Sequence, residues 1–594
     1  MATALSIPHA RMSMWSQAGR LRLAVARGTR LAAQPSRPRL AHFAPRACAG
    51  SEHANDIGAS DPFTVTTPLY YVNAAPHMGS AYPTIAADAI ARYQRLRGRP
   101  VTFITGTDEH GEKIALAAAS RGLEPQAHCD DIVSSYKALW RDLDIAYDSF
   151  IRTTDGRHEA LVSAVLERVW QRGDIYKADY EGYYCVDCEE YKDEADMDAE
   201  KNCPVHRKPC VNRKEENYFF ALSKYQAQLE ELCSDPDFVQ PESRRNEVLG
   251  WVKQGVRDFS ISRAAVEWGI PVPRDPRQTV YVWFDALNGY LSGLLREGHA
   301  EASPEALASA GWPASLHVIG KDILRFHAVY WPAMLMSAGL PPPRRVFGHG
   351  FLTKDGLKMG KSLGNVLEPT ALVGAYGADA VRYYFLREIV FGQDGDFSEE
   401  RFRNIVNANL ANDVGNLLNR TLNLLKKNCG GQLPLDSAAL PADHPLRALA
   451  AEKVPAVAAA FDRLRFDQAC EAALSISGRG NQYLEEVAPW TAFKKGSEED
   501  KAAAAAALVA VLEAVRVVAV LLSPVTPSLS ARIYRQLGLP EEAVAALRWS
   551  DTEWGALRAG HAMPQPQPVM QRLEGDYVTE PAPAAAAAPV GAKA

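Results

Sequence analysis

The stretch FTVTTPLYYVNAAPHMGSAYPTIAADAIARYQRL (63–96) determines which fold class the sequence predicts. Its first part, 63–72, is rich in β-branched and aromatic residues and predicts a strand, whereas 77–97 has helical character. The run VTFITG (101–106) is again strand-like. Such alternation of strand and helix predicts an α/β domain with a doubly wound parallel sheet of the Rossmann type.

Ligands of such sheets bind at the carboxyl ends of the strands. We expect four loops at this edge: PHMGS (76–80), TGTDEHG (105–111), the loop after YVWF (281–284) and the loop after LHVIG (316–320). Each polar residue in them has a simple alternative role as a helix cap. Together they indicate a binding site, with His77, Asp108, Asp285, Lys321 and Asp322 as its polar residues.

Two short runs predict a phosphate site at this edge. His77, at the start of a helix, can donate to a phosphate oxygen, and Gly79 allows a nucleotide to approach the backbone. The lysines of LKMGKS (357–362) can follow the charge that builds on a leaving pyrophosphate. Taken alone, LKMGKS is equally typical of a basic surface turn.

The two ends of the chain differ from the rest in composition. The first fifty residues contain eight arginines and no Lys, Asp or Glu, which is typical of an organellar transit peptide; a disordered basic tail is the alternative. The Pro/Ala-rich end (580–594) predicts disorder. We expect no membrane span, because Glu513 and Arg516 interrupt the apolar run 502–522. The net charge of −6 shows no global basic field.

Four of the nine cysteines cluster in YYCVDCEEYKDEADMDAEKNCPVHRKPC (183–210). The spacing predicts a structural zinc knuckle with four protein ligands and no open coordination position. Cys210 is a fifth candidate that can replace the histidine, and chance clustering of buried thiols is the alternative. The predicted ligands are Cys185, Cys188, Cys203 and His206.

Helical periodicity dominates the last third of the chain. Apolar residues recur at helical spacing in 404–428, 443–464, 466–484 and 500–522. This pattern predicts an all-α bundle after the parallel sheet.

The sequence resembles the class I aminoacyl-tRNA synthetases, and most closely the methionyl-tRNA synthetases of organellar type. The resemblance covers about residues 62–560, with the motifs in family order. PHMGS resembles the HIGH signature and KMGKS the KMSKS loop. The matching runs are TTPLYYVNAAPHMGSAY, ITGTDEHGEKI, YEGYYCVDC, YVWFDALNGY, HVIGKDILRFHAVYWPAMLMSAG, FGHGFLTKDGLKMGKSLGN, DAVRYYFLRE and APWTAFK.

The resemblance implies an enzyme that joins methionine and ATP into methionyl-adenylate and then charges tRNA(Met), initiator and elongator. The implied cofactor is structural Zn²⁺, and ATP with Mg²⁺ is an implied substrate. A monomer is the simpler expectation for the oligomeric state. The implied location is the chloroplast, the mitochondrion or both. Methionine would contact Leu69, Tyr71, Asp108, Trp283, Ala286, Tyr290 and His327, with Asp108 taking the ammonium group and Tyr71 or His327 donating to sulfur. ATP would contact His77, Gly79, Ser80, Gly320, Asp322, Lys358, Lys361 and Ser362. The CAU anticodon would contact Asn416, Arg420 and Trp490, although core packing is the alternative for Trp490.

The implied domains follow in chain order. They are a transit peptide (1–58), the first half of the catalytic domain (59–170), a connective insertion with the zinc knuckle (171–275), the second catalytic half (276–348), the KMSKS-type loop with a stem-contact region (349–395), an α-helical anticodon-binding domain (396–560) and a largely disordered tail (561–594).

Two positions depart from the family signatures. Ser80 stands where the second histidine of HIGH is expected, and Gly360 replaces the serine of KMSKS. A hydroxyl can still donate one hydrogen bond, so we expect an active enzyme; an inactive relative or a zinc-stabilised RNA-binding protein is the alternative. The retained Asp108, Lys358 and Lys361 favour the enzyme. The chain has no room for the editing insertion of the Ile, Val and Leu enzymes, and a closed zinc set argues against a cysteinyl enzyme.

Overall fold

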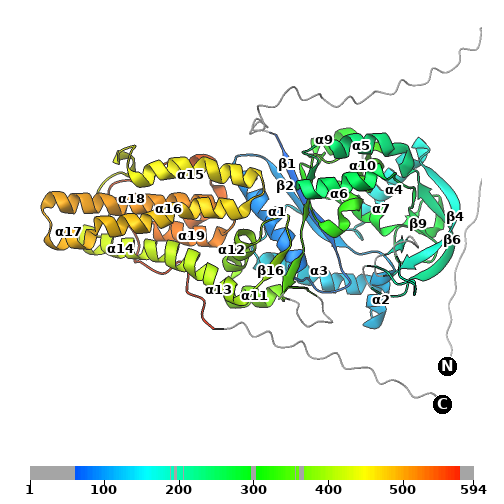
Figure 1. Cartoon of the computed structure of the whole chain (residues 1–594), viewed down its shortest axis with the longest axis horizontal. Coiled ribbons are helices and arrows are strands. Elements are labelled where there is room, and N and C mark those ends of the chain that lie inside the picture. Colours follow the sequence, from blue (N-terminus) through cyan, green and yellow to red (C-terminus); the bar gives the residue numbers. More distant parts are fainter. Residues whose placement is uncertain are drawn as a thin grey trace, which may run out of the picture. The chain divides into compact units, whose positions relative to one another are not determined.

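The computed structural model (Figure 1) describes most of the 594 residues, and the statements below concern that part alone. The described ranges are 61–186, 189–192, 197–204, 207–295, 303–354, 356–359 and 367–575, with only the backbone of Tyr180, Leu357 and Lys358. The predicted transit peptide (1–58) and the end of the tail (576–594) therefore lie outside the described residues.

Strand β1 (Phe63–Tyr71) lies inside a six-stranded sheet whose strand pairs are all parallel. The strand order is β3-β2-β1-β12-β13-β7, so the chain changes direction across the sheet between β1 and β12. This is the topological switch point at which ligands of doubly wound sheets bind. The predicted parallel sheet is thereby confirmed. The other strands are β2 (Val101–Asp108), β3 (Ser149–Arg152), β7 (Val239–Gln240), β12 (Leu316–Gly320) and β13 (Val346–His349).

Helix α1 (Met78–Leu96) follows β1 and starts with a side-chain cap. His77 is the N-cap residue, and it forms a capping box with Ser80. Many residues of α1 are alanines, and most of the helix is buried, which lets it pack closely on the sheet. The helices that accompany the sheet are α2 (Glu112–Ser120), α3 (Pro125–Asp142), α4 (Gly156–Arg172), α5 (Gln226–Ser234), α6 (Glu242–Lys253), α9 (Pro304–Ser309) and α10 (Trp331–Ser337).

A second, antiparallel sheet is inserted after α4. Its strand order is β5-β4-β6-β8, and its long central pair is β4 with β6. The predicted knuckle sequence lies between these two strands. The strands are β4 (Ile175–Cys185), β5 (Glu190–Lys192), β6 (Val211–Phe220) and β8 (Phe259–Ser260).

Within the predicted insertion (171–275), strand β7 pairs with β13 of the central sheet before the chain returns to the antiparallel sheet at β8. One feature of this region differs from the sequence predictions. YVWF (281–284) is not a strand: the strand β11 (Asp275–Val280) belongs to a small antiparallel sheet, and helix α7 (Val282–Leu287) starts directly after it. A short apolar run fits a buried strand or a buried helix equally well. The remaining short elements are β9 (Ser262–Arg263), β10 (Pro271–Val272) and α8 (Gly289–Ser292).

The segment after β13 leads from the sheet to the helices. The hairpin of β14 and β15 carries the start of LKMGKS, and β16 pairs with β14 in parallel. The elements are β14 (Leu352–Lys354), β15 (Leu357–Lys358), α11 (Pro369–Tyr376), α12 (Ala378–Glu388), β16 (Gly395–Phe397) and α13 (Glu399–Val406).

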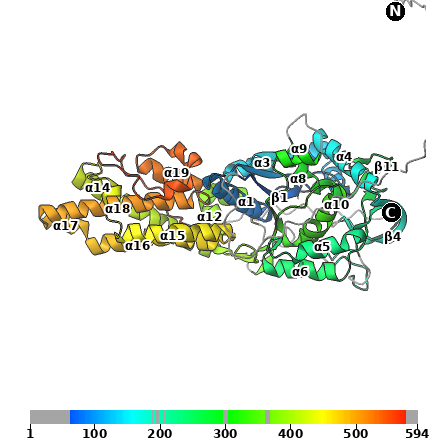
Figure 2. The same cartoon turned by 90° about the horizontal axis from the view of Figure 1, so that it is seen from above.

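The last third of the described chain is mostly helical, as predicted. Figures 1 and 2 show α15, α16 and α18 running alongside one another. A π-helical segment, Asn407–Gly415, joins α13 to α14, which the sequence did not predict. The helices are α14 (Asn416–Cys429), α15 (Pro445–Asp462), α16 (Phe466–Val487), α17 (Pro489–Lys495), α18 (Glu498–Leu522) and α19 (Pro527–Gln536).

Helix α18 is long and apolar enough to cross a membrane, but it is largely buried among the other helices. The two charged residues in its apolar stretch, Glu513 and Arg516, pair with each other at 2.7 Å. Glu513 also accepts backbone N–H bonds from Gly555, Ala556 and Leu557. The apolar composition of α18 is therefore explained by its position in the core of the helical part.

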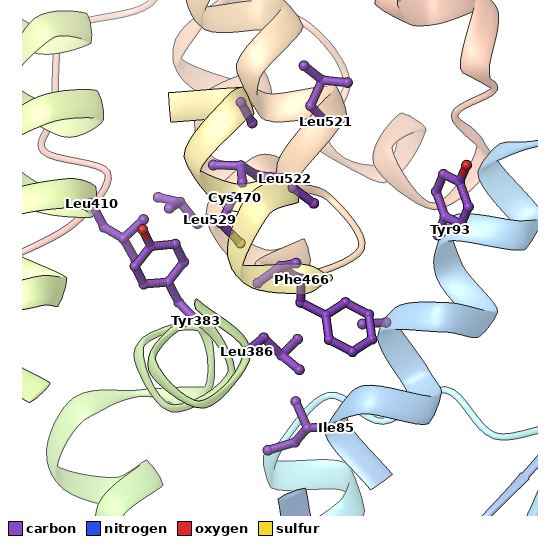
Figure 3. Packing of buried hydrophobic residues seen from close by; sticks show 14 of the residues in the cluster. Ile85, Tyr93, Tyr383, Leu386, Leu410, Phe466, Cys470, Leu521, Leu522 and Leu529 are labelled. Carbon is purple, nitrogen blue, oxygen red and sulfur yellow. The ribbon is translucent and has the colours of Figure 1, made fainter. Parts of the chain in front are cut away.

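The bundle and one face of the sheet share a hydrophobic core, and the other face of the sheet belongs to a second core. Figure 3 shows the junction, where Ile85 of α1 lies near Leu386 of α12 and Phe466 of α16. Tyr93 of α1 stacks on Phe461 of α15, with ring centroids 4.6 Å apart. Helix α1 thus starts at the predicted phosphate site and packs against the bundle along its length.

Residues 561–575 differ from the expectation of a disordered tail. The side chain of Val569 is buried, and its carbonyl accepts a hydrogen bond from Arg532 of α19. Asn407 donates to the Leu573 carbonyl at 3.0 Å. This segment therefore packs on the helical part despite its proline-rich composition.

Candidate active site

The turn from β1 to α1 holds His77 by hydrogen bonds within the signature itself. The Gly79 N–H donates to His77 Nδ1 at 3.0 Å, so the proton of a neutral imidazole lies on Nε2. A Cβ atom on Gly79 would lie only 2.7 Å from His77 Cε1, which explains the glycine. The ring is exposed at the start of α1, where Nε2–H can donate to an anion at the positive end of the helix dipole.

The hydroxyl of Ser80 forms hydrogen bonds within the turn itself. Its hydroxyl donates to the His77 carbonyl at 2.8 Å and accepts from the His77 N–H at 3.2 Å. The side chain is buried and its single proton is used inside the turn. In this arrangement Ser80 has no proton to donate to a phosphate; it fixes the backbone that carries His77.

Asp108 lies at the carboxyl end of β2, where it pairs in register with Tyr71 of β1. It is 9 % exposed, and its Oδ1 has no hydrogen-bond partner among the described residues. The Tyr71 hydroxyl, although its residue is half-buried, also lacks one there. Burial, and then the charges of Asp285 and Glu189, raise the pKa of Asp108 well above its usual value. These two unpartnered oxygens indicate a site for a cationic or donor group.

Beside Asp108, a buried carboxylate holds two histidines. Asp285 of α7 contacts His110 Nδ1 at 2.7 Å and His158 Nε2 at 2.6 Å. His158 also bonds the Ser292 hydroxyl at 2.8 Å. This network ties α7 to the loop after β2 and to the start of α4. His110 and His158 were not among the predicted site residues; the DEHG run is the only sequence signal for the first.

The predicted apolar pocket residues come together beside this network. Trp283 stacks on Phe326 with ring centroids 3.9 Å apart, and its ring edge faces His327 at 6.2 Å. A Cβ atom on Gly289 would lie 2.3 Å from Leu69, so β1 and α8 are in close contact there. Ala286 and Tyr290 are buried on α7 and α8.

The protonation of His327 follows from its partners. His327 Nδ1 lies 3.0 Å from the Ile323 carbonyl and therefore carries the proton, so Nε2 accepts from the Tyr290 hydroxyl at 2.7 Å. Burial lowers the pKa of His327 to about 4, which keeps the ring neutral. Of the two side chains expected to donate to sulfur, His327 therefore has no free N–H in this arrangement.

The predicted nucleotide residues lie at the ends of the adjacent strands. Gly320 ends β12 and pairs in register with His349 of β13. A Cβ atom on Gly320 would lie 2.4 Å from Asp322 Oδ1, so the carboxylate covers the glycine. The backbone of Lys358 pairs with Thr353 in the β14–β15 hairpin. Lys361 and Ser362 lie outside the described residues.

The predicted zinc ligands are described only in part. Cys185 and Cys203 are buried, whereas Cys188 and His206 lie outside the described residues. Within the described ranges, no group of three or more His, Cys, Asp or Glu residues is assembled for a metal ion. Cys210 lies near Cys185 and Cys203: burial, and then the charges of these thiolates, raise its pKa to about 11.

The three predicted anticodon residues lie on one side of the helical part. Asn416 and Arg420 are one turn apart on α14. Arg420 donates to Glu485 of α16 at 2.5 Å, and its guanidinium lies 5.9 Å from the centre of the Trp490 ring. Trp490 is 38 % exposed, unlike a residue packed in the core.

Comparison with known proteins agrees with this arrangement. A family model described as "tRNA synthetases class I (M)" matches residues 63–210 and 199–422, and one described as "Anticodon binding domain of methionyl tRNA ligase" matches 433–583. The chain is 60 % identical over 528 residues to "Methionine--tRNA ligase, chloroplastic/mitochondrial" of Arabidopsis thaliana, covering 89 % of this chain and 85 % of the relative. It is 53 % identical over 524 residues to "Methionine--tRNA ligase" of Synechocystis sp., covering 86 % and 98 %.

Solved structures give the same result. A Mycobacterium tuberculosis methionyl-tRNA synthetase in complex with methionyl-adenylate matches with a TM-score of 0.81 and 41 % identity, covering 86 % of this chain and all of that one. The apo form of the same enzyme matches with a TM-score of 0.75 and 38 % identity, covering 87 % and 99 %. The matches extend from the switch-point site through the helical part, and the chain therefore belongs to the methionyl-tRNA synthetase family of class I aminoacyl-tRNA synthetases.

Proposed function

We propose that this methionine–tRNA ligase binds its amino acid through Asp108 and the aromatic cluster of α7, α8 and residues 326–330. The enzyme joins L-methionine and ATP into methionyl-adenylate and pyrophosphate. It then transfers the methionyl group to the 3′-terminal adenosine of tRNA(Met). The Mycobacterium tuberculosis relative was solved with methionyl-adenylate, the product of the first step.

The observation that carries the amino-acid assignment is the unpartnered Asp108 Oδ1. A buried carboxylate oxygen without a partner is costly, and the α-ammonium group of methionine supplies the missing charge and hydrogen bond. Tyr71, directly beside it in the sheet, forms the adjoining wall. The pKa of Asp108 falls when the ammonium group binds, because an opposite charge favours the carboxylate.

The thioether packs in the space bordered by Leu69, Trp283, Ala286, Tyr290 and His327. Aromatic and small apolar walls suit a soft, polarizable sulfur. The hydrogen bond between Tyr290 and His327 uses the phenol proton and leaves the ring pair neutral, so no cation competes with the ammonium group of methionine. This favours an uncharged side chain of methionine size over a polar one.

ATP binds along the other half of the switch point. The Nε2–H of His77 contacts a phosphate oxygen at the positive end of the α1 dipole, and Gly320 with Asp322 binds the ribose. Lys358, Lys361 and Ser362 contact the phosphates, and Mg²⁺ is held mainly by the phosphates themselves. A carboxylate oxygen of methionine attacks the α-phosphorus, whose bond to the bridging oxygen breaks, and pyrophosphate leaves with that electron pair.

The insertion holds a structural zinc ion in the proposed enzyme. The donor set fits zinc, since Cys185 and Cys203 are buried close to a third thiol, Cys210. Cys188 and either His206 or Cys210 complete four ligands. The ion would stabilise the turn between β4 and β6, and it takes no part in the chemistry.

The helical part reads the CAU anticodon with Asn416, Arg420 and Trp490. An exposed indole offers a stacking surface for an unpaired base, and the amide and guanidinium groups offer hydrogen bonds to base edges. Initiator and elongator tRNA(Met) present the same anticodon, so both are substrates of a monomeric enzyme. The arginine-rich first fifty residues and the chloroplastic/mitochondrial relative in Arabidopsis support an organellar location.

ATP–pyrophosphate exchange with each of the twenty amino acids tests this function. We expect exchange with methionine alone. In Asp108→Asn the KM for methionine should be at least tenfold higher, which corresponds to a loss of about 1.4 kcal/mol in binding free energy. Exchange with another amino acid would overturn the pocket assignment. A folded chain that binds tRNA but supports no exchange would instead be an RNA-binding relative.

A further inference from the structure

Glu189 belongs to the inserted segment, yet its side chain is buried against the catalytic sheet. It follows the second cysteine of the predicted knuckle directly and is only 5 % exposed. Its backbone φ is 52°, in the left-handed region that favours glycine and costs energy for other residues. A long acidic side chain at such a position indicates that the carboxylate has a task that outweighs the backbone strain.

One contact of the carboxylate fixes the start of α2. Glu189 Oε1 accepts the Lys113 N–H at 3.0 Å, and Lys113 is the second residue of that helix. A negative group at a helix N-terminus satisfies an otherwise unpaired amide and interacts well with the helix dipole. The loop that ends at Gly111 begins at Asp108, the proposed ammonium ligand, so Glu189 holds the far end of that loop.

The carboxylate also lies beside the proposed methionine pocket. A Cβ atom on Gly111 would lie 2.4 and 2.7 Å from the two Glu189 oxygens and 2.8 Å from the Tyr71 hydroxyl, so the three oxygens surround one point. Gly111 has φ of +111° and no side chain, which leaves room for this approach. Burial, and then the Glu189 charge, raise the pKa of Tyr71 and keep the phenol protonated.

Attachment of the insertion to α2 does not explain Glu189. Arg213 of β6 already binds Glu112 of α2 with contacts of 2.9 and 2.8 Å. That pair joins the same two elements without reaching Tyr71. Glu189 therefore places a charged oxygen beside the phenol, which simple attachment does not require.

We propose that Glu189 is a positioning residue for methionine, through which the inserted knuckle orders Tyr71 and the Asp108 loop. The proposal rests on the proposed function of Tyr71 and Asp108. Glu189 is placed to accept the Tyr71 hydroxyl proton, which fixes the ring and turns the phenol oxygen lone pairs toward the space that Asp108 borders. Substrate ammonium then meets two ordered acceptors, and the knuckle contributes to amino-acid binding without touching the substrate.

The test compares Glu189→Gly, Glu189→Gln and the matched control Glu190→Gln in the full zinc-loaded chain. Glycine suits the left-handed backbone, and E189G also removes a buried charge; these two gains offset the lost bond to the Lys113 N–H. Glu190 is a neighbouring acid that pairs with Lys192 at 2.6 Å in the same knuckle. The readouts are KM for methionine and for ATP in pyrophosphate exchange, and the rise in melting temperature caused by saturating methionine.

We expect E189G to melt no lower than wild type, with KM for methionine raised about tenfold and KM for ATP changed less than about twofold. E189Q keeps an acceptor for the Lys113 amide, so its KM for methionine should lie between those of wild type and E189G. E190Q should match wild type. A wild-type KM for methionine in E189G overturns the proposal, as does an equal rise of both KM values with a lower melting temperature.

A double-mutant cycle with Tyr71→Phe tests the route. If Glu189 acts through the Tyr71 hydroxyl, the KM for methionine of Y71F/E189G is no higher than that of the single variant with the higher KM. If the fold-increases of the two single variants multiply in the double variant, Glu189 does not act through this hydroxyl. Loss of methionine-dependent exchange in wild type would overturn the proposed function instead. The thermal shift requires no catalysis, so it still reports on Glu189 in that case.

Discussion

The guanidinium of Arg382 donates to the carboxylate of Asp88 at 2.6 Å, and both side chains are fully buried. Asp88 belongs to α1, which starts at His77, and Arg382 belongs to α12. Arg382 also donates to the carbonyls of Pro524 and Val525, in the turn between α18 and α19. One side chain thus connects the signature helix to the helical part.

Replacing Arg382 by methionine should lower the free energy of unfolding by about 3–5 kcal/mol, because the buried Asp88 charge loses one of the two arginines that neutralise it and keeps Arg92 and the Ala146 N–H. Urea denaturation measures this. Arg401→Gln is the control, since Arg401 is half-exposed and lies 3.5 Å from Glu388; it should cost less than about 1 kcal/mol. Equal losses for both variants would contradict the special role of the buried pair.

The same pair gives stability a pH dependence. Burial alone would raise the pKa of Asp88, but Arg382 and Arg92 outweigh burial and hold it below its usual value. A lowered pKa means that the contribution is present at neutral pH and is lost as the pH falls through the folded-state value. We expect Asp88→Asn to flatten the acid side of the stability curve, measured by urea midpoints from neutral to acidic pH. An unchanged acid limb would contradict this.

Methionine binding should weaken as the pH falls. The pKa of Asp108 is raised in the free site, so part of the population is protonated as the pH falls toward this value. The ammonium group needs the carboxylate, so binding releases a proton and KM for methionine decreases as the pH rises through the free-site pKa. Asp108→Asn should abolish this slope. Pyrophosphate exchange across the pH range measures it, with KM for ATP as the internal control.

Ser80→Ala should slow activation only moderately. The variant loses the capping box that holds His77. If this costs the transition state about 1 kcal/mol of stabilisation, the rate of activation falls about fivefold. Ser80→Thr keeps a hydroxyl and should retain most activity, and Ser80→Ala should add little in a His77→Ala background. A decrease of more than about a hundredfold in Ser80→Ala would mean that the hydroxyl contacts the phosphates directly.

Trp490→Ala should weaken tRNA charging and spare adenylate formation. Stacking of a base on an aromatic ring is worth about 1–3 kcal/mol, so KM for tRNA should rise at least fivefold. Trp554→Phe is a control for the general loss of an indole, since Trp554 is partly buried and donates to the Ser437 carbonyl. Normal charging kinetics in Trp490→Ala would remove this residue from the anticodon site.

Lys361→Ala should reduce activation far more than tRNA binding. A cation that follows the charge of leaving pyrophosphate acts in the transition state, so kcat of exchange falls while KM for methionine changes little. Gel-shift binding of tRNA(Met) gives the reference. Normal exchange in the variant would refute the phosphate role.

The sequence predicted those parts of the fold and site that depend on local pattern. Strand β1, the HMGS turn and helix α1 follow one another within a single run, and local propensity and capping determine them. The two-residue strand β7 carries no such pattern, since only its pairing with β13 makes it a strand. YVWF was misassigned because four apolar residues fit a strand or a helix turn.

The network around Asp285 could not be predicted from local pattern. His110, His158 and Asp285 come from three segments far apart in the chain, and only the packing of α4 and α7 on the sheet joins them. The use of the Ser80 hydroxyl likewise depends on the backbone of the turn, which the residue type alone does not specify. Asp108 was predicted because it ends a strand, and its lack of a partner became visible only in three dimensions.

The shared core around α1 limits how this enzyme can be divided or recombined. A fragment that ended at residue 395, at the expected domain boundary, would expose Tyr93, Tyr383 and Leu386, which are buried against the helices that follow. Such a fragment would carry an apolar surface of the kind that promotes aggregation. If the helical part is exchanged between relatives, α12 should therefore be moved with it, so that Arg382 keeps its contacts with the turn at 524–525. Otherwise the face of α1 that packs on the helices has to be redesigned.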